Sequence, residues 1–398
     1  MKKILVYYGY SQKNAGDMAI CLGLLDMLEE IKDCQITLVS RYSKEDSYYI
    51  ESKAFFEKYH PNIVLKPGYI SFNRASGVLS KVKSYLSGFF VSTFKCFNKR
   101  MRHDVDDADL VLFNGGNYLR CNSLTDKLRL RALFFPIKYA KKAGKPIICM
   151  PQSSTTAKNK RSLKALQKVC GYFDKIFVRE PISYKYLLDN NVCDEKRIVQ
   201  SCDLAFFSID RFKGSDNKSI DKNNNVAINA RITGIGDIGK ISDEKINMIK
   251  ECYESLIQKH QNKHFSFVCQ TDKDDAFMKE LYECFINKGY KNISYKKSND
   301  AYELKRIYKD HGLLISMRLH ASILALSVNT PVIGFTFDEW GFKNKGILNQ
   351  FSSETFDSSE GVLNKVESFY NEKQNQSNEK TINNFKNEII NEIERVLF

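Results

Sequence analysis

Arginine and histidine stand two residues apart in the segment Ser316-Met-Arg-Leu-His320, directly after the apolar run 312–315. An arginine guanidinium can hold a carboxylate or a phosphate through two hydrogen bonds. Histidine can give or take a proton near neutral pH. Alternation along an extended strand would place Arg318 and His320 on the same side. The segment is therefore a candidate anion-binding and proton-transfer site; the alternative is a strand end whose polar side chains are simply solvated.

The loop after the first apolar run contains Gly16 and Asp17 and leads into an apolar helix-period segment. Glycine permits close approach of the backbone, and a helix N-terminus attracts an anion or a hydrogen-bonding ligand. Asp17 is therefore either a carboxylate that acts as a base or orients a substrate, or simply the helix N-cap. The loop matches neither Gly-x-Gly-x-x-Gly nor a Walker loop, so a dinucleotide or ATP phosphate site is not indicated.

Two further strand ends carry candidate binding residues. Asn114-Gly-Gly-Asn-Tyr118 follows an apolar run, and its paired glycines expose backbone amides that suit a substrate-lining turn, or any tight turn. Arg179-Glu180 follows another apolar run, where the guanidinium can hold a carboxylate or a phosphate. The alternative for this second segment is an ordinary surface ion pair.

Short apolar runs alternate with helix-period segments along the chain, and this pattern positions the four candidate segments. Near-continuous apolar strands separated by helices are typical of parallel sheets covered on both faces, the doubly wound α/β class. In this class the loops at the carboxyl ends of the strands form the ligand sites. The predicted strands are 4–8, 36–40, 110–114, 146–150, 176–179, 226–229, 265–269, 293–296, 313–317 and 332–335; the predicted helices include 19–30, 124–142, 163–172 and 244–259.

The length of 398 residues indicates two domains. The polar stretch 212–225 has no apolar periodicity and is the predicted linker. We predict an N-terminal Rossmann-like domain at 1–211, a C-terminal one at 226–370, and a C-terminal helix at 371–398 that packs back on the first domain. Two such domains would face each other across a ligand-binding cleft.

Composition narrows the class of protein and of partner. The formal charge of +14 favours anionic partners such as phosphorylated small molecules, nucleic acid or an acidic membrane surface. The eleven cysteines are scattered and include no Cys-x-x-Cys pair, so no zinc ribbon or thioredoxin-type site is expected and a reducing cytoplasm is favoured. No signal-peptide pattern and no apolar run long enough to span a membrane is found, so we expect a soluble or peripheral protein.

One segment, at about 68–103, interrupts the alternation of strands and helices. From residue 58 to residue 103 there is no aspartate or glutamate. A basic, aromatic-rich amphipathic segment can lie on an anionic membrane surface; the alternative is a helical insertion whose aromatic side chains face the core. Nucleic acid is not expected, because no recognised binding module accompanies the charge. The basic residues are Lys58, Lys66, Arg74, Lys81, Lys83, Lys95, Lys99, Arg100 and Arg102, and the aromatic residues interleaved with them include Phe72, Tyr85, Phe89, Phe90, Phe94 and Phe97.

With these segments together, the chain resembles the polysaccharide pyruvyl transferase family. The resemblance covers about residues 1–350, in the right order. Its most specific part is Ser316-Met-Arg-Leu-His320 followed by Pro331-Val-Ile-Gly-Phe335. The supporting motifs are Asn14-Ala-Gly-Asp-Met-Ala-Ile, Asn114-Gly-Gly-Asn-Tyr-Leu, Val178-Arg-Glu-Pro-Ile-Ser-Tyr and Ser201-Cys-Asp-Leu-Ala-Phe-Phe.

The resemblance implies a glycosyltransferase-B-like fold of two Rossmann-like domains. It also implies transfer of a pyruvyl group from phosphoenolpyruvate to two hydroxyls of a sugar in a cell-surface polysaccharide or its lipid-linked precursor. The products are a cyclic ketal and phosphate. No metal or other cofactor is implied, since phosphoenolpyruvate is itself the donor substrate. Such acceptors are often carried on membrane lipids, so the expected location is the cytoplasm, peripherally at the inner face of the cell membrane.

The family also implies roles for individual residues. Arg318, His320 and Asp17 are the expected catalytic residues, with His320 as the acid for either the methylene carbon or the departing phosphate, and Asp17 as the base. Arg179 and Arg318 are expected to clamp phosphoenolpyruvate from opposite domains. The residues implied to bind phosphoenolpyruvate are Arg179, Arg318, Leu319, His320 and Lys343; those implied to bind the acceptor are Asn14, Gly16, Asp17, Asn114, Gly115, Gly116, Asn117 and Glu180.

Two segments depart from the family, and two other functions fit the same architecture. Relatives often carry an aromatic residue and then a lysine soon after Pro-Val-Ile-Gly; here the segment reads Phe337-Asp-Glu-Trp340, and Lys343 is a closer match than Lys345. Pro151-Gln-Ser also replaces a more glycine-containing loop.

The first alternative function is a nucleotide-sugar glycosyltransferase, in which a carboxylate of the pair 338–339 would bind the ribose. The lesser one is a non-enzymatic anion- or glycan-binding protein.

Overall fold

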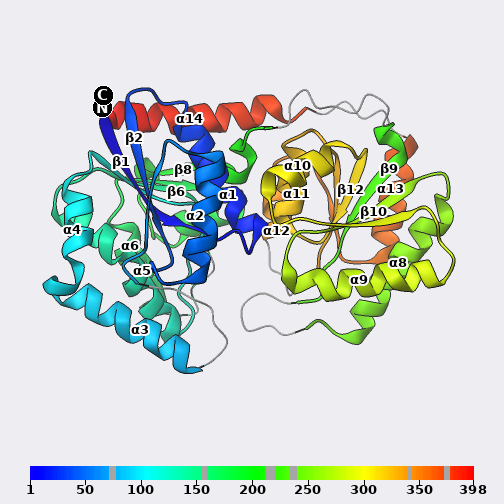
Figure 1. Ribbon diagram of the computed structural model, residues 1–398, viewed down its shortest axis with the longest axis horizontal. Helices are drawn as coiled ribbons and strands as arrows, with labels where there is room; N and C mark the ends of the chain where they lie inside the picture. Colours follow the sequence, from blue (N-terminus) through cyan, green and yellow to red (C-terminus); the bar gives the residue numbers. More distant parts are fainter. Residues whose placement is uncertain are drawn as a thin grey trace. The chain divides into compact units, whose positions relative to one another are not determined.

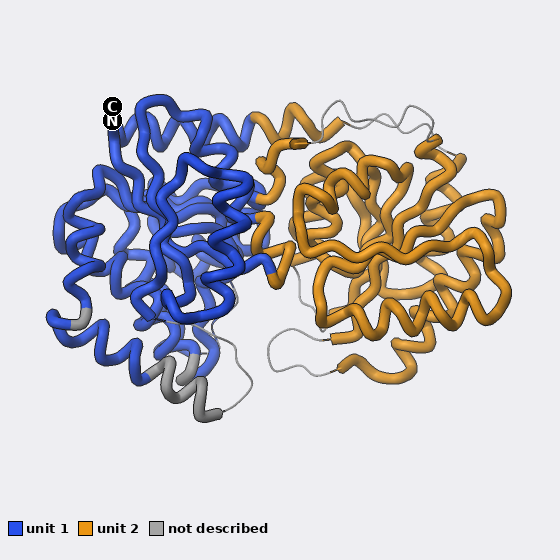
Figure 2. The backbone as a smooth tube through the Cα atoms, in the orientation of Figure 1, with its two compact units in different colours: residues 1–12, 20–204, 384–398 blue, residues 13–19, 205–383 orange. Residues whose placement is uncertain are grey.

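The chain forms two compact units in the computed structural model (Figure 2). Unit 1 comprises Met1–Gln12, Ile20–Leu204 and Asn384–Phe398, and unit 2 comprises Lys13–Ala19 and Ala205–Asn383. The predicted linker at 212–225 falls within unit 2, and its residues 212–220 lie outside the described part of the chain. The described residues are 1–70, 78–154, 157, 159–211, 221–233, 240–338, 343–371 and 377–398, with backbone alone at 78–85, 97, 124 and 125.

Unit 1 is built on an eight-stranded parallel sheet with the order β3-β2-β1-β4-β6-β7-β8, in which β5 pairs with β6 (Figure 1). Every residue of β4 and β6 is buried, as expected for strands with both sheet faces covered. The strands are β1 (Lys2–Gly9), β2 (Cys34–Ser40), β3 (Val64–Lys66), β4 (Leu110–Phe113), β5 (Gly116–Leu119), β6 (Ile147–Ser154), β7 (Lys175–Val178) and β8 (Ile198–Gln200). The helices are α1 (Ala15–Leu28), α2 (Ser47–Tyr59), α3 (Val78–Thr93), α4 (Lys99–Asp106), α5 (Leu124–Lys142), α6 (Lys160–Cys170) and α7 (Pro181–Asp189).

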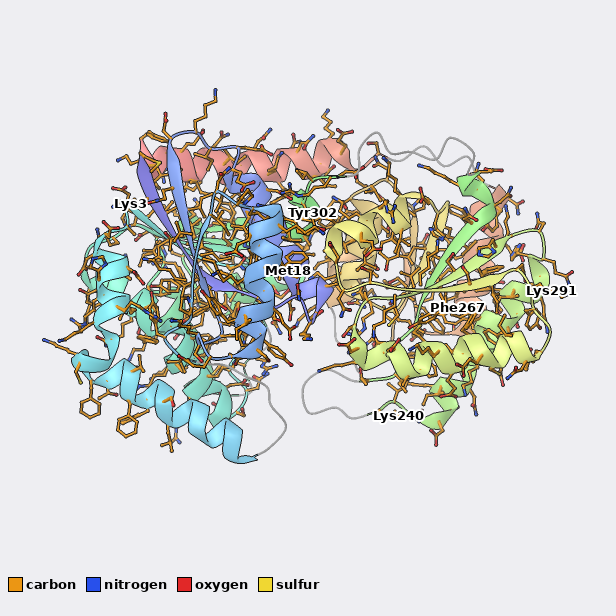
Figure 3. The ribbon with its side chains drawn as sticks, in the orientation of Figure 1. Lys3, Met18, Lys240, Phe267, Lys291 and Tyr302 are labelled. Carbon is orange, nitrogen blue, oxygen red and sulfur yellow. The ribbon has the colours of Figure 1, made fainter. Side chains whose placement is uncertain are left out.

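Unit 2 is built on a six-stranded parallel sheet with the order β11-β10-β9-β12-β13-β14. Its core lies on this sheet and includes Phe267 of β10, which is fully buried (Figure 3). The strands are β9 (Asn225–Asn229), β10 (His264–Cys269), β11 (Ile293–Lys297), β12 (Leu313–Ser316), β13 (Val332–Phe335) and β14 (Thr355–Phe356). The helices are α8 (Asp243–Lys259), α9 (Asp272–Asn287), α10 (Ala301–Lys309), α11 (Leu319–Leu326), α12 (Lys343–Asn349) and α13 (Ser359–Asn371). Helix α14 (Glu379–Leu397) begins in unit 2 and continues in unit 1.

The predicted doubly wound α/β class is confirmed, and each predicted strand is present. Helix α5 has the predicted bounds. The strands that sequence reasoning missed, β3, β5, β8 and β14, have two to four residues each, too few for a clear apolar period. Strand β5 begins at Gly116, whose φ of 137° is accessible to glycine, so a segment expected to be only a turn joins the sheet instead.

Two segments join a unit that is remote from them in sequence. Residues 13–19 belong to unit 2, where Asn14 forms an isolated antiparallel bridge with Thr271. Residues 384–398 of helix α14 belong to unit 1, where Lys386 Nζ lies 2.9 Å from Glu30 Oε1. Ile389 of α14 is fully buried, so the predicted return of the C-terminal helix to the first domain is confirmed.

The basic segment at about 68–103 is largely helical, and three of its phenylalanine side chains lie at the surface, whereas the Tyr69 hydroxyl bonds to Asp104. Phe89, Phe90 and Phe94 are each more than two-fifths exposed, so the alternative in which the aromatic side chains face the core is wrong for these three; Leu86 beside them is exposed as well. Helix α3 packs through its other side, where a Cβ added to Gly88 would lie 2.8 Å from Ala132 Cβ of α5. Phe72 and Arg74, and the side chains of Lys81, Lys83, Tyr85 and Phe97, lie outside the described residues. Among the described helices, none is both long and apolar enough to cross a membrane.

We expect acid to destabilise the protein, because the histidine just before β12, His311, is buried. Its side chain is buried and shares a 2.7 Å hydrogen bond with the Ile307 carbonyl through Nδ1. Burial lowers its pKa to about 4. Between about pH 6.5 and pH 4 His311 is therefore protonated in the unfolded chain but not in the folded chain. The free energy of unfolding falls through this window by up to about 3 kcal/mol. Urea unfolding of the wild type and of His311→Gln from pH 7 to pH 4 measures this loss, which should be smaller in the variant.

Candidate functional site

The two sheets each have a point where the strand order reverses, and in open parallel sheets ligands bind outside the carboxyl ends of the strands there. In unit 2 the reversal falls between β9 and β12, and in unit 1 between β1 and β4. Arg231 follows β9, and Arg318 follows β12. The unit 2 reversal therefore has an arginine on each side.

Arg318 is held at the N-cap position of helix α11. Its backbone N–H donates to Ser316 Oγ at 3.1 Å, and Ser316 Oγ donates to the Arg318 carbonyl at 3.0 Å. The guanidinium makes a bidentate pair with Asp274, at 2.6 Å from Nε to Oδ2 and 2.5 Å from Nη2 to Oδ1. Asp274 is buried in the first turn of α9, and Arg318 keeps 17% of its side chain exposed. The ion pair thus orients a guanidinium that solvent can still reach.

Strand alternation does not explain how Arg318 and His320 are placed. Strand β12 ends at Ser316, and helix α11 begins at Leu319, so the prediction that both side chains extend from one strand is wrong. His320 lies in the first helical turn, where consecutive side chains are about 100° apart around the axis. Arg318 therefore extends from the extended N-cap residue, and His320 from the first turn of the helix.

The imidazole of His320 packs directly on the backbone of Gly16, within unit 2. A Cβ added to Gly16 would lie 2.5 Å from His320 Nδ1 and 2.9 Å from His320 Cβ, so only glycine fits there. Asn14 shapes this loop, because its side-chain oxygen accepts from the Gly16 N–H at 3.1 Å and its carbonyl accepts from Met18 N at 2.9 Å. The structure therefore brings Asn14, Gly16 and His320 together; Asp17 is half-buried in the first turn of α1.

Arg231 is a candidate that sequence reasoning missed. It is buried, and its Nε donates to the Thr233 carbonyl at 2.9 Å. Its pKa is lowered to about 9, mainly by burial and also by the positive charge of Arg318, while Asp274 acts in the opposite sense. Two guanidinium groups thus influence one carboxylate, an arrangement that favours binding of an added anion. Its position just after a predicted strand, like that of Arg179 or Arg318, was the signal that could have identified it.

In unit 1 the glycine turn after β4 is held by buried amides. Asn114 Nδ2 donates to the Tyr8 carbonyl at 2.9 Å, and its Oδ1 accepts from Gly115 N at 2.7 Å. A Cβ on Gly115 would lie 2.8 Å from Leu204 Cδ1, and a Cβ on Gly116 would lie 2.4 Å from the Tyr10 hydroxyl. Asn114 therefore braces the turn. Contact of the turn and of Asn117 with an acceptor stays a prediction.

Arg179 and Glu180 are buried in unit 1 and have protein partners. Arg179 forms an ion pair with Asp203 and donates from Nε to Ser153 Oγ at 2.7 Å. Glu180 caps helix α7 by accepting from Ser183 N at 2.7 Å, and burial raises its pKa. The alternative interpretation, in which Arg179 and Glu180 form an ordinary ion pair at the surface, is therefore wrong. Their contact with phosphoenolpyruvate or an acceptor stays a prediction.

The remaining candidates lie in unit 2. Leu319 is the first residue of α11 and Lys343 the first residue of α12, and both are half-buried. Asp338 is exposed, whereas residues 339–342 lie outside the described part of the chain. Roles for Leu319 and Lys343 stay predictions.

One group of residues in unit 1 has side chains of the kind that bind metals, although no metal was expected. His60, Asp26 and Glu29 lie close together. His60 Nδ1 is 3.1 Å from Glu29 Oε1, and His60 Nε2 is 3.9 Å from Asp26 Oδ1. The two ring nitrogens face different carboxylates, whereas an ion takes one nitrogen of a ring. This geometry is that of an ion-pair triad that joins the end of α2 to α1.

The unit 2 group is thus suited to bind a small anion beside an imidazole. A guanidinium held by Asp274 can present its free N–H groups to a phosphate or a carboxylate, and a second buried guanidinium supplies further positive charge. The imidazole of His320 is a side chain that can act as a general acid. The arrangement suits acid catalysis on an anionic substrate.

Comparison with solved structures supports the fold. The chain is similar to UDP-GlcNAc 2-epimerase from Methanocaldococcus jannaschii (14% identity, 95% of each chain, TM-score 0.61). It is similar to the Neisseria meningitidis enzyme of the same name bound to UDP-GlcNAc (13% identity, 99% of this chain and 100% of that one, TM-score 0.61). It is also similar to Anabaena HepE in complex with UDP (11% identity, 99% and 100%, TM-score 0.60). These likenesses establish a GT-B-like fold.

Comparison of the sequence establishes the family. A search among curated proteins finds no match. Residues 14–339 match the family described as polysaccharide pyruvyl transferase, and this span contains the Gly16 loop, Arg231, Asp274, Arg318 and His320. Since the match extends over well more than half of the sequence, the chain belongs to the polysaccharide pyruvyl transferase family.

Proposed function

We propose that the protein transfers a pyruvyl group from phosphoenolpyruvate to two hydroxyls of a sugar in a surface polysaccharide or its lipid-linked precursor. The observation that carries this proposal is the Arg318 guanidinium held by Asp274 at the N-cap of α11, with buried Arg231 after β9 on the other side of the strand-order reversal and His320 in the first turn of α11. Phosphoenolpyruvate has a phosphate and a carboxylate, so a site for it needs more than one fixed cation. Membership of the family supports the same reaction class.

In this proposal His320 is the acid. Protonation of the methylene carbon of phosphoenolpyruvate gives an oxocarbenium-like centre at C2, which a sugar hydroxyl attacks as it loses its proton to a base. The second hydroxyl then displaces inorganic phosphate, and the ketal closes. Alternatively, His320 gives its proton to the departing phosphate. Arg231 and Arg318 stabilise negative charge on the donor in either case.

The acceptor side of the proposal rests on the Gly16 loop. Asp17 lies one residue after the glycine that contacts His320, in the first turn of α1, so a hydroxyl bound at this turn would find a carboxylate base. Asn14 orients the loop through its hydrogen bond to Gly16. Arg179, Leu319 and Lys343 are further proposed donor contacts, and Glu180 and the 114–117 turn further proposed acceptor contacts.

Phosphate release is the test of the proposed function. Purified protein is incubated with phosphoenolpyruvate and a panel of lipid-linked sugars, nitrophenyl glycosides and glycosyl phosphates, and inorganic phosphate is assayed. We expect release that needs both partners, together with an acid-labile pyruvate adduct of the sugar. Turnover of a UDP-sugar without any reaction of phosphoenolpyruvate would instead establish a glycosyltransferase, and would contradict the proposal.

We also infer that the exposed side of α3 binds an anionic lipid bilayer, which suits a lipid-linked acceptor. Leu86, Phe89, Phe90 and Phe94 form an exposed apolar strip. Arg131 lies over the Phe89 ring at 4.8 Å, and Lys95 and Lys99, which are exposed, follow α3 along the chain. Exposed aromatic residues with cations on the same segment are typical of peripheral membrane contacts.

Vesicle binding tests this surface. The double variant Lys95→Glu/Lys99→Glu should bind vesicles containing phosphatidylglycerol at least about tenfold more weakly than the wild type, since each basic residue near such a surface contributes roughly 1 kcal/mol. The matched control, Lys288→Glu/Lys291→Glu, makes the same charge change in unit 2 (Figure 3 labels Lys291) and should bind as the wild type does. Equal binding by both variants would contradict the inference.

A further inference from the structure

Unit 1 has its own group of arginines at the carboxyl ends of its strands. Arg41 directly follows β2, Arg120 directly follows β5, and Arg129 extends from helix α5. Arg129 Nη2 donates to the Tyr118 carbonyl at 3.2 Å and lies 3.4 Å from the Arg120 carbonyl, so the helix side chain closes over the end of β5. The group lies beside the reversal of strand order, where a ligand site is expected.

A single carboxylate is shared by two of these arginines. Arg120 Nε donates to Asp126 Oδ1 at 3.0 Å, and Arg129 Nε lies 3.7 Å from the same oxygen. The second oxygen of Asp126 accepts from Asn122 N at 2.9 Å. Arg120 and Arg129 keep 33% and 20% of their side chains exposed. Positive charge therefore exceeds negative charge in a place that a ligand can reach.

Arg41 adds a third positive charge over an aromatic pair. Its Cζ lies 5.5 Å from the ring centroids of both Tyr10 and Tyr118, and those rings are stacked with centroids 5.9 Å apart. The pKa of Arg129 is lowered to about 10, mainly by burial, and the positive charges of Arg120 and Arg41 contribute to this lowering. A bound anion would relieve this repulsion, because it would place negative charge among the three guanidinium groups.

We propose that Arg41, Arg120 and Arg129 form a second anion site, which binds a phosphate or pyrophosphate ester group of the acceptor. The inference rests on the proposed function, because it takes the arginine pair of unit 2 as the donor site. It adds that the acceptor is anionic, a glycosyl phosphate or a sugar linked through pyrophosphate, and not a neutral saccharide. Guanidinium groups arranged around one oxyanion are a common means of recognising such esters.

Binding of inorganic pyrophosphate tests the site without any turnover. Calorimetric titration is carried out on the full chain with saturating phosphoenolpyruvate, which occupies the unit 2 site. Arg129→Gln and Arg41→Gln should each weaken pyrophosphate binding by about 10- to 100-fold, since each removes charge-assisted hydrogen bonds. Lys138→Gln removes an exposed positive charge from the same helix α5 and should bind pyrophosphate as the wild type does.

The variants separate the outcomes. Arg41→Gln is measured beside Arg129→Gln because Arg129 also supports the end of β5, and thermal unfolding verifies that both are folded. Wild-type affinity for pyrophosphate in both folded variants would overturn the site. If the titration with phosphoenolpyruvate alone shows no binding while pyrophosphate binding still depends on Arg41 and Arg129, the proposed donor fails and the anion site stands.

Inhibition kinetics test the assignment to the acceptor. Pyrophosphate should compete with a glycosyl phosphate acceptor and not with phosphoenolpyruvate, and Arg129→Gln should raise the acceptor KM with little change in kcat. A neutral nitrophenyl glycoside should be a poorer substrate by about 10-fold or more, and Arg129→Gln should not affect its KM. Inhibition that is non-competitive with the acceptor, or equal KM values for charged and neutral acceptors, would overturn the assignment.

Discussion

His320→Ala is expected to reduce kcat for phosphoenolpyruvate-dependent phosphate release by about 10²- to 10⁴-fold, the usual contribution of a positioned acid. The stability of the variant should change little, since His320 is only half-buried at the start of α11. Steady-state assays of phosphate release by the wild type and the variant measure the loss.

Two comparisons make this prediction specific. His264→Gln changes another half-buried histidine of unit 2, which is 2.9 Å from Ser294 Oγ and away from the site, and it should retain activity. Gly16→Ala should reduce kcat by about tenfold or more without unfolding the protein, because its added Cβ would displace the His320 ring whereas alanine suits a helix. Full activity in His320→Ala would eliminate the histidine as the acid.

Arg318→Gln is expected to lower both stability and affinity for phosphoenolpyruvate. Asp274 is buried and has a bidentate pair with Arg318, so the variant leaves a buried carboxylate without its main partner. Breaking such a pair from one side costs roughly 3 kcal/mol. Urea unfolding should therefore show a lower midpoint with an unchanged slope.

The double variant Arg318→Gln/Asp274→Asn separates stability from binding. Removing both charges should restore much of the lost stability, because the carboxylate is no longer buried alone. The KM for phosphoenolpyruvate should remain high, since the guanidinium that holds the anion is absent. Lys250→Gln, which breaks the more exposed pair with Glu280, should cost no more than about 1 kcal/mol and leave the KM unchanged. Recovery of the KM in the double variant would show that Arg318 is structural.

Local sequence pattern was sufficient for the architecture. Strand β4 is an uninterrupted apolar run and β12 is apolar up to its last residue, Ser316, and near-continuous apolar runs are typical of buried parallel strands. The carboxyl ends of those strands then indicated where Arg318, Asn114 and Arg179 would lie. The family could be identified in the same way, because its motifs occupy short continuous segments.

Tertiary structure alone decided which side chains meet. Nothing near Arg318 in the sequence indicated Asp274, which is 44 residues away, and no pattern showed that Gly16 would support the His320 ring. The burial of Arg179 against Asp203 was equally hidden, since a strand end is compatible with an exposed or a buried arginine. Periodicity reports which face of an element is apolar, whereas ion pairs and close backbone contacts depend on how remote elements pack. The sequence by itself therefore determined the two sheets and the strand ends at which the candidate residues lie, and packing decided the partners of each charged group.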